Sequence, residues 1–153
     1  MTEENHLLPE ERIDEHTSSR DELILPARVE NLEAFQTFVA EKVGEDCPFK
    51  TQMQIDLAVE EIFVNIASYA YAPGEGPAAL RVEVSDTPRA VTLTFRDHGI
   101  PYDPLTREDP DVNAMAKDRQ IGGLGVFLTK QIMDEVHYEY KASQNVLTMK
   151  KKL

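Results

Sequence analysis

The stretch from Thr51 to Tyr71 constrains the fold more than any other part of this sequence. Its apolar residues recur three and four positions apart, which predicts a long helix with one buried face. This apolar stripe consists of Ile55, Val59, Ile62, Phe63, Ile66 and Ala70. The segment "YAPGEGPA" at residues 71–78 holds two glycines and two prolines, which predicts the end of the helix.

Alternating segments predict a sheet that covers this helix. Two hairpins are expected, one over residues 80–95 around "SDTPR" and one at the end of the chain around "KASQ". Residues 22–25 precede Pro26 and predict an edge strand. Further helices are expected over residues 29–43 and after the glycines at 122–125. The sequence therefore predicts an α+β fold, with helices layered on one face of a mixed, mostly antiparallel sheet.

Length and composition are those of one globular domain. The chain has 153 residues, of which 41% are hydrophobic and 29% charged. Residues 1–20 lack periodicity and predict a flexible acidic arm, which leaves residues 21–153 as the folded domain. Residues 101–121 hold three prolines and no clear period, and a connection of this length predicts a lid.

Charge excludes two classes of partner. A formal net charge of -12 would repel nucleic acid and anionic lipid surfaces, so a protein or a small ligand is the expected partner. The sequence has no long apolar run and begins with polar, acidic residues, so a cytoplasmic location is expected. The single cysteine, Cys47, cannot form an internal disulfide and is interpreted as a passive thiol.

The glycines of "GGLG" at residues 122–125 stand where a helix must begin. The first N–H groups of a helix lack internal partners and carry partial positive charge, so they can bind phosphate oxygens. Alternatively, the glycines only allow a tight turn with positive φ. The spacing fits neither a Walker loop nor a dinucleotide fingerprint, and the protein-kinase motifs are missing.

Two further motifs carry polar residues beside the predicted core. Glu61 and Asn65 are four residues apart, so both lie on one helix face, where the carboxylate could act as a base and the amide as a magnesium ligand. Asp97 ends a predicted strand and could accept a hydrogen bond from an exocyclic amine, with Gly99 in the following turn. The alternatives are a solvated helix face and ordinary turn chemistry. Glu60 points elsewhere and is interpreted as a surface residue.

The order of these motifs resembles the Bergerat ATP-binding fold of type II topoisomerases, chaperones and histidine kinases. "AVEEIFVNIASYAY", "DHGIPYDPL", "GGLGVFLTKQIMDEVHYEY" and "NVLTMKKKL" are most similar to the anti-sigma regulatory factor group of serine kinases, over roughly residues 22–153. The resemblance implies a two-layer α/β sandwich that binds ATP and Mg²⁺. It also implies a homodimer whose partners are a sigma factor and an anti-sigma factor antagonist protein.

The resemblance assigns roles to single residues. Glu61 is similar to the general base and Asn65 to the magnesium ligand, while Asp97 would accept the adenine amine. The remaining implied ATP-binding residues are Gly99, Gly122, Gly123, Leu124, Gly125 and Thr148, the last on the opposite side of its strand from Leu147 and Met149. Lys117 or Arg119 could neutralise the terminal phosphate, or remain solvated in the lid.

Three functions follow from this resemblance. The first is an anti-sigma factor serine kinase, which sequesters a sigma factor and phosphorylates an antagonist protein on serine. Tyr69 replaces a histidine common in the family, and Pro101 a frequent glycine. Tyr69 leaves open a second function, an ATP-gated protein-binding module without phosphoryl transfer. A histidine-kinase core is disfavoured, because no phosphoacceptor helix is expected before the domain.

Overall fold

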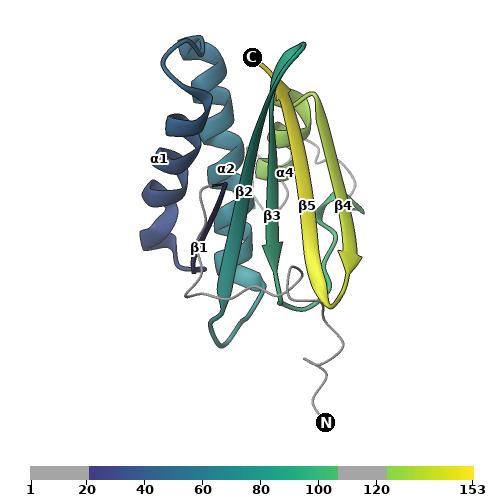
Figure 1. Cartoon of the computed structure of the whole chain (residues 1–153). Helices are drawn as coiled ribbons and strands as arrows, with labels where there is room; N and C mark the ends of the chain where they lie inside the picture. Colours follow the sequence, from purple (N-terminus) through teal and green to yellow (C-terminus); the bar gives the residue numbers. More distant parts are fainter. Residues whose placement is uncertain (1–20, 107–123) are drawn as a thin grey trace, which may run out of the picture.

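The computed structural model describes residues 21–106 and 124–153 of the chain (Figure 1). The predicted acidic arm and most of the predicted lid fall outside this description. So do four residues with a predicted role, namely Lys117, Arg119, Gly122 and Gly123.

In the described part of the chain, the sheet has five strands in the order β1-β2-β3-β5-β4. Their bounds are β1 (Glu22–Pro26), β2 (Pro77–Asp86), β3 (Arg89–Asp97), β4 (Glu135–Lys141) and β5 (Gln144–Lys152). Each neighbouring pair is antiparallel. The predicted edge strand and both hairpins are confirmed, whereas the expected mixed sheet contains no parallel pair among its described strands.

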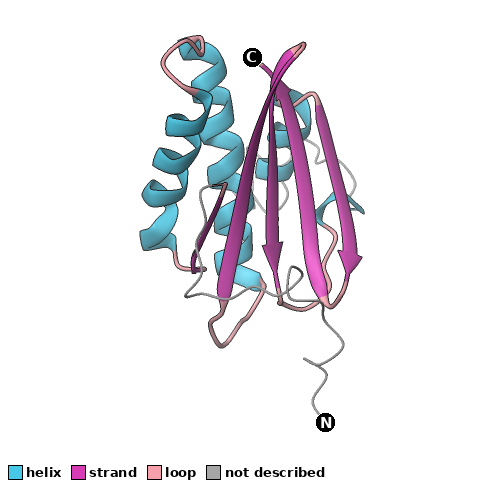
Figure 2. Cartoon of the chain, viewed as in Figure 1, coloured by secondary structure: helices cyan, strands magenta, loops and turns pink. Residues whose placement is uncertain are grey.

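Within the described residues, three α-helices lie on one face of this sheet (Figures 1 and 2). They are α1 (Leu32–Val43), α2 (Phe49–Tyr69) and α4 (Leu124–Ile132), with short 3₁₀ turns at η3 (Val29–Asn31) and η4 (Pro104–Thr106). The predicted two-layer α+β architecture is therefore confirmed. None of the helices in the described ranges is both long and apolar enough to cross a membrane.

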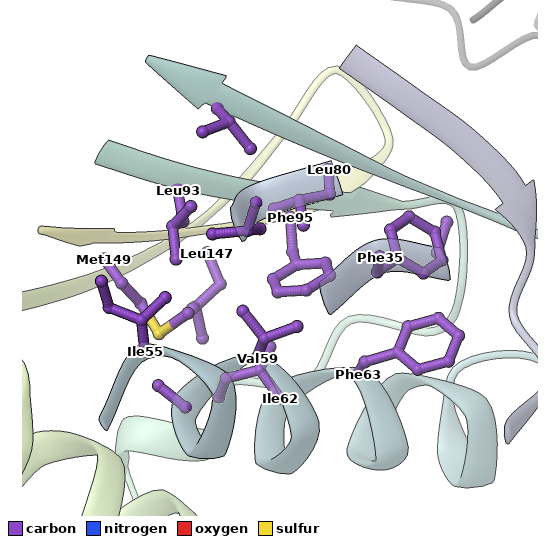
Figure 3. Close-up of a cluster of buried hydrophobic side chains, with 14 of the residues drawn as sticks. Phe35, Ile55, Val59, Ile62, Phe63, Leu80, Leu93, Phe95, Leu147 and Met149 are labelled. Atoms are coloured by element: carbon purple, nitrogen blue, oxygen red, sulfur yellow. The ribbon is translucent and has the colours of Figure 1, made fainter. Parts of the chain in front are cut away.

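The core fills the space between α2 and the sheet, as Figure 3 shows. Every residue of the predicted apolar stripe of α2 is buried. Three aromatic rings meet there, with centroid separations of 4.8 Å between Phe35 and Phe63, 6.3 Å between Phe35 and Phe95, and 6.5 Å between Phe63 and Phe95. Burial of each such side chain contributes about 1.5 to 3 kcal/mol, so this layer fixes α2 and the site residues on it.

The hairpin between β4 and β5 turns through two residues with positive φ. Ala142 has φ of 53° and Ser143 has φ of 61°. A two-residue loop with positive φ at both positions matches the right-handed twist of the flanking strands, but it is strained for residues other than Gly, Asn and Asp. The pairing of Lys141 with Gln144 closes this turn and sets the register of β5.

Candidate nucleotide site

A cavity of about 400 Å³ lies between the C-terminal half of α2 and the end of β3. Most of its wall is apolar, including Ile62, Ile66, Phe95 and Leu147. Its polar groups include Asn65, Asp97 and Asn145, which come from α2, β3 and β5. A pocket of this size with an apolar wall and a few convergent polar groups is typical of a small-molecule site.

Asp97 is the buried acid of this cavity, with 4% of its surface exposed. Its Oδ1 accepts hydrogen bonds from the backbone N–H of Gly99 (2.8 Å) and from Nδ2 of Asn145 (2.9 Å). Its Oδ2 accepts none from the described residues, which leaves one carboxylate oxygen for a ligand. Burial raises the pKa of Asp97 above its ordinary value, although hydrogen bonds from Asn145 and Gly99 oppose this effect.

Gly99 lets the chain pass close to the end of α2. A Cβ atom at this position would lie 2.3 Å from the carbonyl oxygen of Ala70, so only glycine fits. The close approach allows the N–H of Ile100 to donate to that same oxygen at 3.0 Å. Gly99 therefore joins α2 to the loop after β3, and its contact with a nucleotide stays a prediction.

Glu61 lies against the first turn of α4. A Cβ atom on Gly125 would lie 1.9 Å from Oε2 of Glu61, so glycine is what allows the two helices to approach here. Glu61 is half-buried and has no hydrogen bond or ion pair within the described part of the chain. Burial, and secondarily the charge of Glu60, raise its pKa. Glu60 itself is exposed, as expected for a surface residue.

Asn65 lies one helical turn beyond Glu61 and lines the cavity that contains Asp97. Its side chain makes no hydrogen bond within residues 21–106 and 124–153. The amide oxygen of Asn65 is a hard ligand suited to Mg²⁺. No cluster of three or more His, Cys, Asp or Glu in the described ranges could hold a metal. A single amide oxygen from Asn65 therefore fits a Mg²⁺ ion that takes its other ligands from phosphates and water.

Thr148 is not brought to this cavity, which corrects its expected place. The neighbouring residues of β5, Leu147 and Met149, are buried against the helices, so Thr148 faces the opposite side of the sheet. Asn145 shares the side of Leu147 and occupies the cavity instead. The sequence could have indicated this position, because Asn145 is a polar residue on the side of the strand that Leu147 and Met149 predict to be buried.

Aromatic residues that the sequence analysis did not assign also line the cavity. Tyr138 comes from β4, and Tyr102 comes from the loop that follows Gly99. Tyr69 lines it too, although 60% of its surface is exposed. Leu124 begins α4, but its predicted contact with ATP is untested, as are the contacts predicted for Gly122 and Gly123 outside the described ranges. Sequence alternation could have placed Tyr138, whereas Tyr102 depends on the course of a loop.

A family model and several named kinases match the sequence of this chain. A family model described as "Histidine kinase-like ATPase domain" matches residues 25–151. Over 100 residues the chain is 32% identical to a serine/threonine-protein kinase BtrW of Bordetella bronchiseptica, covering 65% of this chain and 70% of that protein. It is 30% identical over 100 residues to a serine-protein kinase RsbW of Listeria monocytogenes, covering 63% of each chain.

One solved structure supports the fold alone. The histidine kinase domain of the blue-light activated histidine kinase of Erythrobacter litoralis EL346 superposes with a TM-score of 0.50 and 16% sequence identity. The match covers 90% of this chain and 65% of that one. The resemblance drawn from the order of the motifs is confirmed by the family model and the two kinases, and its fold by this structure.

Proposed function

Because the chain belongs to the histidine kinase-like ATPase domain family, we propose that it is an anti-sigma factor serine kinase. In this proposal it binds Mg-ATP in the cavity beside α2 and phosphorylates an anti-sigma factor antagonist protein on serine. It also sequesters a sigma factor when the antagonist is phosphorylated, and it acts as a homodimer. The names of the Bordetella and Listeria relatives support the kinase activity.

The carrying observation is the position of Glu61. Its carboxylate is half-buried and unpaired in the described residues, touches the start of α4 at Gly125, and lies one turn from Asn65. A raised pKa, and no ion pair with a cation of the described residues, suit a group that must accept a proton. Successive turns of α2 would then serve the phosphate end of a nucleotide, Asn65 by holding the metal ion and Glu61 by accepting the proton.

Phosphoryl transfer follows from these residues. The serine oxygen of the antagonist attacks the terminal phosphorus, the bond from that phosphorus to the bridging oxygen breaks, and ADP leaves. Glu61 accepts the serine proton. N–H groups in the first turn of α4 stabilise negative charge on the transferred group. Asn65 would hold Mg²⁺, which supplies charge neutralisation between the phosphates when it is bound.

Adenine recognition belongs to the other end of the cavity. The free Oδ2 of Asp97 can accept a hydrogen bond from the exocyclic amine, while the apolar wall contacts the faces of the base. A base with an oxygen in place of that amine would bring one hydrogen-bond acceptor against another, the Oδ2 of Asp97. Adenine nucleotides are therefore the expected substrates.

The exposure of Tyr69 favours a second candidate function. Where the family commonly has a histidine, this chain presents a phenol that lines the cavity and is 60% exposed. This observation favours an ATP-gated module that grips a protein without phosphorylating it.

Radiolabelled ATP, Mg²⁺ and an anti-sigma factor antagonist protein provide the test. The kinase proposal expects label on the antagonist, with transfer lost in Glu61→Gln while ATP binding persists. Glu60→Gln is the matched control, because it removes the neighbouring exposed carboxylate and should leave transfer unchanged. Undiminished transfer by Glu61→Gln contradicts the proposed base, and ATP binding without any transfer supports the module.

A further inference from the structure

Asn145 is the most heavily hydrogen-bonded side chain of the cavity. Only 7% of its surface is exposed. Its Nδ2 donates to Oδ1 of Asp97 at 2.9 Å, to the carbonyl oxygen of Ile100 at 2.8 Å and to that of Gly99 at 3.4 Å. Its Oδ1 accepts from the N–H of Tyr102 at 3.1 Å and from the hydroxyl of Tyr138. One side chain of β5 thus contacts β3, β4 and the loop after β3.

These bonds saturate the amide. A side-chain amide has two N–H donors and a carbonyl oxygen with two lone pairs, and every one of them has a protein partner here. The partners also fix which end is nitrogen, since a carboxylate and two carbonyl oxygens surround Nδ2 while two donors surround Oδ1. Asn145 therefore has no hydrogen-bonding capacity left for a ligand, and any effect on a bound base passes through its partners.

The partner that matters for the base is Asp97. Both hydrogen bonds received by this carboxylate end on Oδ1, one from Gly99 and one from Asn145, and together they fix the plane of the carboxylate. Oδ2 is thereby the oxygen that remains for a ligand. The same amide also ties the loop at Gly99, Ile100 and Tyr102 to β5, so the wall of the cavity and its acid are set by one residue.

We propose that Asn145 is the positioning residue for base selection: it orients Asp97 toward the exocyclic amine of adenine and holds the loop at residues 99–102 against β5. Tyr138 supports it by donating to Oδ1 from the edge strand β4. This inference rests on the proposed function, because the selected ligand is an adenine nucleotide. It assigns to Asn145 an effect on which base binds, beyond any effect on folding.

Selectivity is the readout that a merely structural role would not change. Wild type and Asn145→Leu are titrated calorimetrically with ATP and with inosine triphosphate, which carries an oxygen in place of the amine. Loss of a hydrogen bond to a charged group predicts that Asn145→Leu weakens ATP binding about 10- to 100-fold. Binding of inosine triphosphate should change by less than about threefold, because it never used the oriented carboxylate as an acceptor.

Gln144→Leu is the matched control. Gln144 is buried, neighbours Asn145 in β5 and carries the same amide, but it faces Arg96 rather than the cavity. Its replacement should leave the preference for ATP unchanged. A control that lost selectivity as strongly as Asn145→Leu would show that disturbance of β5, and not orientation of Asp97, causes the effect.

A double-mutant cycle with Asp97→Ala tests the route of the effect. Once Asp97 is absent, Asn145→Leu should change ATP affinity by less than about threefold, because residues acting through one another are not additive. Additive losses, or equal losses for ATP and inosine triphosphate, overturn the proposal. Should Asn145→Leu fail to fold by circular dichroism, Asn145→Ser takes its place. Its shorter hydroxyl cannot reach Asp97, Ile100 and Tyr102 together, and wild-type selectivity in that variant also overturns the proposal.

The two proposals fail in different ways. If the wild-type chain binds neither ATP nor ADP, the nucleotide site itself is wrong and the role of Asn145 falls with it. If the wild type binds ATP in preference to inosine triphosphate and the folded Asn145 variants keep that preference, only the positioning role is wrong.

Discussion

Gly125→Ala separates the role of the α4 start in catalysis from its role in folding. The added Cβ would lie 1.9 Å from Oε2 and 2.6 Å from Cδ of Glu61. An ordinary contact begins near 3.4 Å, so one side must move by about 1.5 Å. The atom that is struck is the far end of a flexible side chain, so the carboxylate turns away while both helices stay in place.

The expected magnitudes follow from this geometry. Displacement of a catalytic group by about 1 Å costs about 100-fold in rate, so phosphotransfer should fall by at least that factor. Stability should be unchanged or slightly higher, since alanine is favoured over glycine in a helix by up to about 1 kcal/mol. Single-turnover transfer of label from ATP to the antagonist measures the rate, and thermal unfolding measures the stability.

Gly74→Ala is the control for this prediction. Gly74 lies in an exposed loop, and a Cβ there would meet only the carbonyl oxygen of Tyr71 at 3.4 Å, an ordinary contact. Its transfer rate should match the wild type. A folded Gly125→Ala protein that also transfers phosphate at the wild-type rate would refute the assignment of Glu61 as the base held against α4.

Three more outcomes are expected. Gly99→Ala should lower the free energy of unfolding by about 1 to 3 kcal/mol in urea titrations, because its Cβ would strike backbone atoms of Ala70 that cannot rotate away. Replacing Ala142 and Ser143 by Asn-Gly should raise that free energy by about 1 kcal/mol, since both residues have positive φ. The transfer rate should fall as pH is lowered through the pKa of Glu61. Because burial raises that pKa, the fall should be centred above the ordinary value of 4.5, and it should vanish in Glu61→Gln.

The periodicity of apolar residues predicted the helix layer and the sheet layer, because the residues that recur with that period are the ones that become buried. The apolar stripe of α2 is buried, and so are the alternating apolar residues of β2, β3 and β5 except Val84, which is half-buried. Helix ends were less accurate, since α2 begins at Phe49 rather than Thr51 and residues 29–31 form a 3₁₀ turn. Terminal turns depend on local hydrogen bonds that periodicity does not encode.

The candidate site was predictable where a motif required it, and less so where tertiary contact decides. Asp97 and Asn65 line one cavity. The order of their motifs predicted a shared site, but only the folded chain brings the two side chains together. Asn145 was missed although alternation puts it on the same side of β5 as Leu147 and Met149, because Thr148 was chosen by likeness to the family instead. The packing of β5 between β3 and β4 shows that this side of the strand faces the helices and the cavity.

Electrostatics connect the two ends of the proposed nucleotide site. The pKa values of Glu61 and Asp97 are both raised mainly by burial, so each carboxylate is held in a place that disfavours its charge. A triphosphate beside Glu61 would disfavour that charge further, and in a chain with net charge -12 the described residues offer Glu61 no ion pair as compensation. In the proposed site, the start of α4 and a cation on Asn65 would supply charge balance, and Lys117 or Arg119 is the further source that the sequence predicts. Proton acceptance by Glu61 should consequently depend on the same cation that holds the phosphates, which couples nucleotide binding to the activity of the base.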